Sequence, residues 1–184
     1  MKIDWKKTIK IAAILGSFAA IGGISVAVVN VFTAPRIEAY KVEKEQKGLQ
    51  KIFGGLADCD PSEKVELSEA DSPYLLAYYP AYEAGSKTLM GRIYSTSGTN
   101  AYGSVSLLVG LTSSFSLYNL VVMENTESYA QTLVDNYLNP LIQSADKESA
   151  LDEVKCGATY GAKLVRSMVE QAKEHYRSET EGQS

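Results

Sequence analysis

The sequence predicts an α+β protein in which one N-terminal transmembrane helix precedes an antiparallel sheet with helices packed on it. Residues 9–32 form an apolar run in which Lys10 is the only charged residue. Residues 104–123 have the pattern of a strand, a short turn and a return strand, and apolar side chains recur at helical spacing from Ala162 to Tyr176. We therefore divide the chain into four parts: an N-terminal segment with the transmembrane helix (1–33), a juxtamembrane helix and loop (34–73), a sheet domain (74–178) and a polar tail (179–184).

The apolar run is long enough to cross a bilayer, which takes about 20 predominantly apolar residues. It is longer than the roughly 7–15 residues of a signal-peptide core, so we favour an uncleaved anchor over a cleaved signal and over a buried soluble helix. The lysines beside the run all lie on its N-terminal side: Lys2, Lys6, Lys7 and Lys10. This asymmetry predicts a cytoplasmic N-terminus in a cell membrane and an extracytoplasmic main domain.

After the membrane run, Pro35 suits the first turn of a second helix, which we expect to stop at Gly54 and Gly55. Residues 56–73 are acidic and rich in turn formers, which is typical of a loop. The aromatic residues 74–82 predict a strand, and Pro80 within them indicates an edge strand or a broken one. A turn at Gly85 leads to a predicted strand over 88–95.

The predicted hairpin of residues 104–123 has one clearly buried face, formed by Val105, Leu107, Val109 and Leu111. We expect a turn at 112–114, a helix over 128–138 that Pro140 ends, and a charged loop over 146–153. The amphipathic pattern then predicts a helix from about Ala162 and a polar tail from Ser178.

Composition excludes several classes of function. Four of the 18 basic and one of the 22 acidic residues lie within residues 1–10, so 14 bases and 21 acids remain and give the rest of the chain a formal charge of −7. An acidic body argues against a nucleic-acid partner, which requires clustered Lys and Arg. One histidine and two cysteines are too few for a zinc-type cluster. Cys59 and Cys156 either form a disulfide or are free thiols, and spacing alone does not decide.

The stretch 153–159 reads EVKCGAT and ends in a hydroxyl just before the amphipathic helix. A threonine here either caps the helix or carries an anion that the free N–H groups and the helix dipole stabilise.

Several motifs together resemble the flavoprotein subunits of Rnf-type ferredoxin:NAD oxidoreductases (the G subunit) and of sodium-pumping NADH:quinone oxidoreductases (the C subunit). The anchor ends in a Thr-x-Pro-x-Ile-like exit at Thr33, and Tyr102-Gly103 enters the apolar hairpin. Where the family has a His-x-Glu-Thr-Pro-Gly-like turn, residues 125–129 read NTESY. The stretch 153–159 stands where the family has its Asp-x-x-Ser/Thr-Gly-Ala-Thr flavinylation motif.

This resemblance implies FMN, joined covalently through its phosphate to Thr159 by a separate flavin transferase. The cofactor-binding residues that it implies are Thr159, Ala158, Gly157, Cys156, Glu127, Ser128 and Tyr129. The chain would relay electrons among the other membrane subunits of such a complex and would not be a complete enzyme alone, because it has no nucleotide-binding glycine loop and no iron–sulfur cysteine set.

The chain departs from the family pattern at four places. Glu153 replaces Asp, Cys156 replaces Ser or Thr, Tyr160 follows the attachment residue, and residues 129–132 (YAQT) replace Pro-Gly-Leu-Gly. Two alternatives therefore stay open: a free-standing membrane-anchored flavinylated electron-transfer protein, and a flavin-less assembly or structural subunit.

Overall fold

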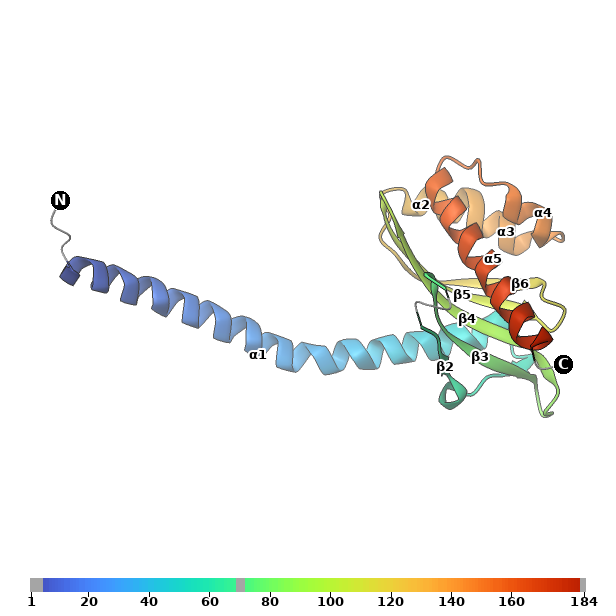
Figure 1. The fold of residues 1–184 in the computed structure, drawn as a ribbon, viewed down its shortest axis with the longest axis horizontal. Coiled ribbons are helices and arrows are strands. Elements are labelled where there is room, and N and C mark those ends of the chain that lie inside the picture. The colour runs from blue at the N-terminus through green and yellow to red at the C-terminus, as the bar shows by residue number, and fades with distance from the viewer. Residues whose placement is uncertain (1–4, 69–71, 183–184) are drawn as a thin grey trace. The chain divides into compact units, whose positions relative to one another are not determined.

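The structure is a computed structural model that describes residues 5–68 and 72–182. Contacts divide the chain into two compact units, Met1–Glu43 and Lys44–Ser184, and the helix α1 (Trp5–Ile52) begins in the first and ends in the second. The second unit is an antiparallel sheet with helices packed against it, so the predicted α+β class is confirmed (Figure 1).

Helix α1 is long and apolar enough in its N-terminal part to cross a membrane. The predicted break between a membrane helix and a juxtamembrane helix is wrong, because Pro35 lies inside one continuous helix. Proline removes one backbone hydrogen bond but has a φ that suits a helix, and the helix formers on both sides continue the helix through it. The predicted stop is confirmed: α1 ends at Ile52, and Gly54 and Gly55 have φ of 59° and 82°.

Within residues 5–68 and 72–182, six strands form the sheet: five follow the order β1-β3-β4-β5-β6, and β2 also pairs with β3. All pairs are antiparallel. The strands are β1 (Ala57–Asp58), β2 (Val65–Glu66), β3 (Leu75–Glu83), β4 (Leu89–Asn100), β5 (Gly103–Thr112) and β6 (Leu117–Asn125). The predicted loop over 56–73 thus contains two very short strands and a 3₁₀ turn, Pro61–Glu63; residues 69–71 of that range lie outside the described residues.

Strand β3 is an inner strand of the sheet, with β4 on one side and the two short strands β1 and β2 on the other. Strand β2 pairs with Ala77 and Tyr78, and β1 pairs with Tyr82 and Glu83, so Pro80 lies in the gap between these two pairings. A residue without an N–H suits such a gap. The prediction of an edge strand or a broken strand is therefore wrong for β3 as a whole, which is continuous and has partners on both sides.

Strand β4 is longer than the predicted 88–95. Its polar continuation to Asn100 pairs with β5, and only Ala101 and Tyr102 connect the two strands. Gly98 and Asn100 in this continuation have low strand propensity, and here the pairing with β5 outweighs it. The predicted hairpin over 104–123 is confirmed as β5 and β6.

The sheet is buried on both faces, whereas the sequence predicted one. On one face, Val105, Leu107 and Val109 pack with α5 (Thr159–Glu181). On the other face, Leu108 packs with Leu49 and other residues at the C-terminal end of α1. The apolar stripe of that helix end therefore covers the second face.

The helical cover on the α5 side consists of α2 (Ala130–Leu133), a π-helical turn (Val134–Leu138), α3 (Asn139–Gln143), α4 (Lys147–Asp152) and α5. The prediction that Pro140 ends a helix is wrong, because the chain stays helical through Gln143, with the wider π-turn just before the proline. The predicted charged loop is also wrong: Asp146 accepts a hydrogen bond from the Ser149 N–H (3.1 Å) and starts α4. Helix α5 starts before Ala162 and extends through most of the predicted tail, to Glu181.

Candidate functional site

Two chain turns are joined side by side at one end of the sheet. The Thr126 N–H donates to the Ser104 carbonyl, and the Ser128 N–H donates to the Tyr102 carbonyl, each over 2.9 Å. Gly103, with φ of 144°, lets the backbones meet, because a Cβ there would lie 2.6 Å from the Thr126 carbonyl oxygen. The β4–β5 turn and the turn after β6 therefore form one continuous surface.

The start of α5 lies against this surface. Gly157 turns the chain with φ of 86°, and the buried Ala158 occupies the N-cap position without a side-chain hydrogen bond. The first helical bond runs from the Ala162 N–H to the Ala158 carbonyl (3.0 Å). The N–H groups of Thr159, Tyr160 and Gly161 find no acceptor among residues 5–68 and 72–182. Three free donors and the positive end of the helix dipole thus meet at one place.

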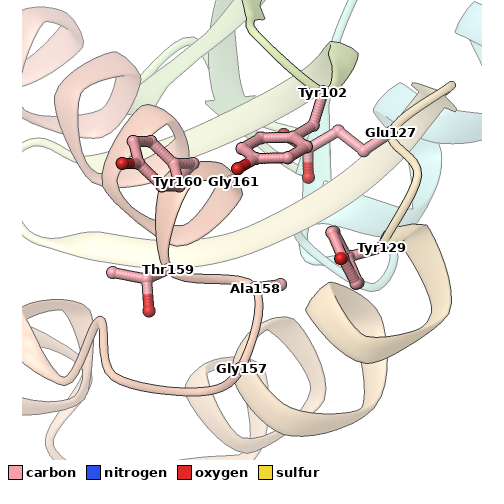
Figure 2. Close-up of a pocket in the computed structure, with 8 residues that line it drawn as sticks. All are labelled: Tyr102, Glu127, Tyr129, Gly157, Ala158, Thr159, Tyr160 and Gly161. Atoms are coloured by element: carbon pink, nitrogen blue, oxygen red, sulfur yellow. The ribbon is translucent and has the colours of Figure 1, made fainter.

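A pocket of about 220 Å³ lies between these segments (Figure 2). Its lining residues are Tyr102, Glu127, Tyr129 and the run Gly157, Ala158, Thr159, Tyr160 and Gly161. The Tyr102 ring is central, with its centroid 5.7 Å from that of Tyr129 and 5.3 Å from that of Tyr160. The three rings are 40–61% exposed, so they offer aromatic surface to a bound molecule.

Glu127 is the charged group of this lining, and it is 6% exposed. The Asn100 side-chain amide donates to its Oε1, and its own backbone N–H donates to Asn125 Oδ1 over 3.1 Å. Its Oε2 lies where a Cβ on Gly161 would stand. A carboxylate at this position is stabilised by the positive end of α5.

Thr159 is half-buried and is the first residue of α5, after the N-cap. Its hydroxyl makes no hydrogen bond with any residue that the structure describes. The alternative that Thr159 is an ordinary helix cap is therefore wrong, because Ala158 occupies that position.

The structure brings together five of the seven residues expected at the site: Glu127, Tyr129, Gly157, Ala158 and Thr159. Ser128 and Cys156 lie outside the pocket lining. The exposed Ser128 hydroxyl donates to the Tyr102 carbonyl (3.3 Å), and the half-buried Cys156 packs against the core.

Three lining residues were not predicted: Tyr102, Tyr160 and Gly161. Tyr160 and Gly161 directly follow Thr159, so the first turn of the helix was the signal that could have identified them. Tyr102 joins the site only because β4 extends to Asn100 and brings the turn to this end of the sheet.

Both cysteines are free. Cys59 packs with the cluster on the α1 side of the sheet, and Cys156 packs with the cluster on the α5 side. A disulfide between them would have to pass through the sheet, so the structure favours two separate thiols. Burial, with the neighbouring carboxylates of Asp60 and Glu63, raises the pKa of the Cys59 thiol to about 12.

Comparison with family models gives one finding. The model described as the RnfG N-terminal region matches residues 1–52, which comprise the apolar helix and its continuation to the start of the sheet domain. A comparison with curated proteins found no match.

Proposed function

We propose that the chain belongs to the RnfG-type FMN-binding subunit family and is a subunit of an Rnf complex, which the match of residues 1–52 supports. On this premise we propose that the chain carries FMN, linked through its phosphate to Thr159, and relays electrons within an Rnf-like ion-translocating ferredoxin:NAD oxidoreductase complex. One observation carries the proposal: a threonine hydroxyl with no protein partner lies in the wall of a pocket, at the free N–H groups of a helix.

The start of α5 suits a phosphodiester. Such a group keeps one negative charge, which the free N–H groups of Thr159, Tyr160 and Gly161 and the helix dipole stabilise. In forming the ester, the threonine hydroxyl loses its proton, its oxygen bonds the phosphorus, and the leaving group of an activated flavin nucleotide departs. A separate flavin transferase would supply this chemistry, since the chain itself has no nucleotide-binding glycine loop.

The rest of the pocket suits the flat ring of a flavin. Tyr102, Tyr129 and Tyr160 provide aromatic surface, and Glu127 provides a buried hydrogen-bond acceptor. When bound, FMN would supply the redox chemistry, while the protein positions it and sets its electrostatic surroundings. The cavity of about 220 Å³ is smaller than the roughly 300–1,000 Å³ of typical ligand sites, so it takes part of the cofactor.

The topology is part of the proposal. A cytoplasmic N-terminus, indicated by the lysines before the apolar run, places the sheet domain outside the cytoplasm. Protease added to intact spheroplasts should then degrade the domain, and a domain that resists until the membrane is opened would contradict this topology.

The attachment is tested on the full chain, produced with and without a flavin transferase. We expect a fluorescent band on a denaturing gel and a whole-protein mass increased by FMN less one water. Thr159→Ala should abolish both, whereas Thr159→Ser keeps a hydroxyl at the same place and is the matched variant. A dark wild-type band with an unmodified mass would instead support the flavin-less assembly subunit.

Co-purification from the native membrane distinguishes a subunit of a complex from a free-standing electron-transfer protein. An electron-relay subunit of a complex should elute with other membrane subunits after mild detergent extraction. A flavinylated chain that elutes alone would support the free-standing electron-transfer protein.

A further inference from the structure

One oxygen of the Glu127 carboxylate accepts a hydrogen bond from the protein, and the other faces the pocket. Asn100 donates to Oε1, whereas Oε2 has no donor among the described residues and is reached by solvent, since none of their buried side-chain oxygens lacks a partner. The side chain is 6% exposed and reaches toward the first turn of α5, beside the Tyr102 ring (Figure 2). A donor on a bound molecule can therefore take the place of water at Oε2.

Asn100 fixes the orientation of this carboxylate. Its amide nitrogen donates to Glu127 Oε1, and its own Oδ1 accepts the Tyr102 backbone N–H over 2.7 Å. One side chain thus ties Glu127 to the turn that carries the central tyrosine. The absence of a side chain at Gly161 leaves room for the second oxygen, since a Cβ there would collide with it.

We propose that Glu127, oriented by Asn100, accepts a hydrogen bond from the flavin and makes the bound flavin harder to reduce. The inference rests on the proposed function, because it requires FMN on Thr159. Flavins carry suitable donors, namely the ring N–H and the ribityl hydroxyls. Reduction adds electrons to the ring, and a fixed negative charge in a largely buried site disfavours that added charge.

The test is the midpoint potential of the covalently flavinylated full chain, measured by spectroelectrochemistry. Glu127→Gln can keep the bond from Asn100 and turns the free acceptor into a donor without a negative charge. We expect it to favour reduction roughly tenfold or more, which is a rise of about 30 mV for a two-electron couple. Glu124→Gln removes the same charge from an exposed residue of β6 outside the pocket lining, and should leave the potential unchanged.

Two further variants separate the charge from the fold. Glu127→Asp keeps the charge, so its potential should stay below that of Glu127→Gln. Asn100→Ala removes the positioning residue but keeps the charge, so its potential should stay at or below the wild-type value. A general loosening of the pocket would instead shift the Asn100→Ala and Glu127→Gln proteins in the same direction.

Each outcome is decisive. A flavinylated Glu127→Gln protein whose potential matches that of wild type or of Glu124→Gln overturns the role of Glu127 and leaves the attachment at Thr159 intact. A chain that takes up no flavin on a denaturing gel overturns the proposed function, and this inference fails with it.

Discussion

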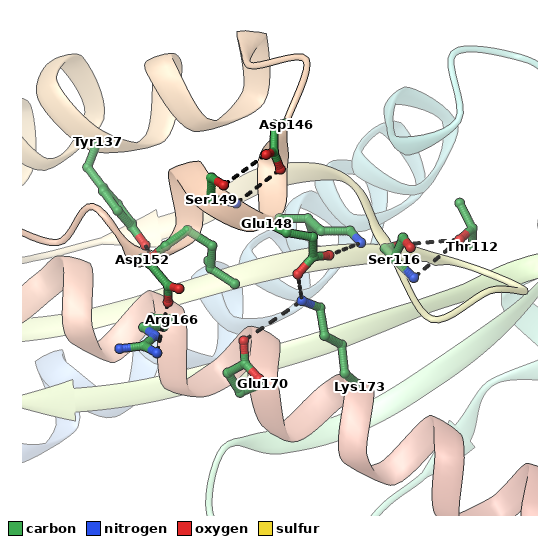
Figure 3. Close-up of polar contacts among 12 residues, drawn as sticks. Thr112, Ser116, Tyr137, Asp146, Glu148, Ser149, Asp152, Arg166, Glu170 and Lys173 are labelled. Carbon is green, nitrogen blue, oxygen red and sulfur yellow. Dashed lines mark hydrogen bonds and ion pairs between the residues drawn. The ribbon is translucent and has the colours of Figure 1, made fainter.

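The ion pair between Glu148 and Lys173 should be the strongest polar link between α4 and α5 (Figure 3). The Lys173 side chain is 5% exposed, and its ammonium contacts Glu148 and lies 3.8 Å from Glu170. The other carboxylate oxygen of Glu148 accepts the Leu117 N–H at the start of β6, over 3.2 Å. Glu148→Ala would therefore leave a buried lysine with one more distant partner and would remove a bond to the sheet.

The expected loss follows from these contacts. Removing one partner of a fully buried ion pair costs about 3–5 kcal/mol. Glu148 is 53% exposed and Glu170 remains beside Lys173, so we reduce this to about 1–2 kcal/mol. The lost bond to the Leu117 N–H adds about 1 kcal/mol. A total of about 2–3 kcal/mol should lower the midpoint of thermal unfolding by roughly 4–12 °C in a chain of this size.

Circular dichroism of the full chain in detergent measures this shift. The matched control is Asp152→Ala, which breaks the exposed pair between Asp152 and Arg166 (2.8 Å) on the same two helices and should cost under about 1 kcal/mol. In a Lys173→Met background the cost of Glu148→Ala should fall to about 1 kcal/mol, since no buried charge is left unpaired. A Glu148→Ala cost no greater than that of Asp152→Ala, or one that is unchanged in the Lys173→Met background, would contradict this role of the ion pair.

Four further predictions concern the site and its surroundings. Gly161→Ala puts a methyl group into the Glu127 carboxylate and should lower stability by about 1–3 kcal/mol and reduce flavin incorporation; a thermal melt unchanged from wild type would contradict the packing. Tyr160→Leu should raise the fluorescence of the attached flavin in the native state at unchanged in-gel intensity, because an adjacent phenol ring quenches flavin emission, and equal native fluorescence would remove Tyr160 from the flavin surface. Thr159→Ala, equilibrated with free FMN and passed through a sizing column, should retain no stoichiometric flavin, since the cavity holds only part of the cofactor. Burial raises the pKa of the Cys59 thiol from 9.0 to about 12. The contribution of this thiol to stability is therefore present below about pH 9 and is lost as the pH rises toward 12. Cys59→Ala should flatten this alkaline decline of stability in urea titrations, and a decline identical to that of wild type would contradict the prediction.

Local pattern was sufficient for the elements that carry strong periodicity. The alternation of Val105, Leu107 and Val109 predicted β5, and the stripe through Val165 and Met168 predicted α5. Pro80 indicated a position without full pairing, and it lies in the gap between β1 and β2, because its missing N–H is a property of the residue itself. In each case the physical cause lies within the element.

The errors have causes outside the element concerned. The polar end of β4 is a strand because β5 pairs with it, and Leu108 is buried because the end of α1 covers its face. The sequence of the polar end of β4 does not show that β5 pairs with it, and the sequence around Leu108 does not show that α1 covers it. The same holds for Glu127, whose burial and orientation depend on Asn100 and Gly161, residues that lie on other elements.

The pocket explains why a covalent link would suit this site. Its parts come from three separate turns, and the cavity of about 220 Å³ cannot enclose a whole FMN. A partly enclosed ligand recovers less of the free energy that binding costs, so affinity for the free cofactor would be low. A bond to Thr159 turns association into an intramolecular contact, for which even weak interactions with Tyr102, Tyr129 and Glu127 suffice. The small residues Gly157 and Gly161 would then have a common role: they let the start of α5 lie close to Thr132 and Glu127 and leave space near the hydroxyl through which the cofactor would be held.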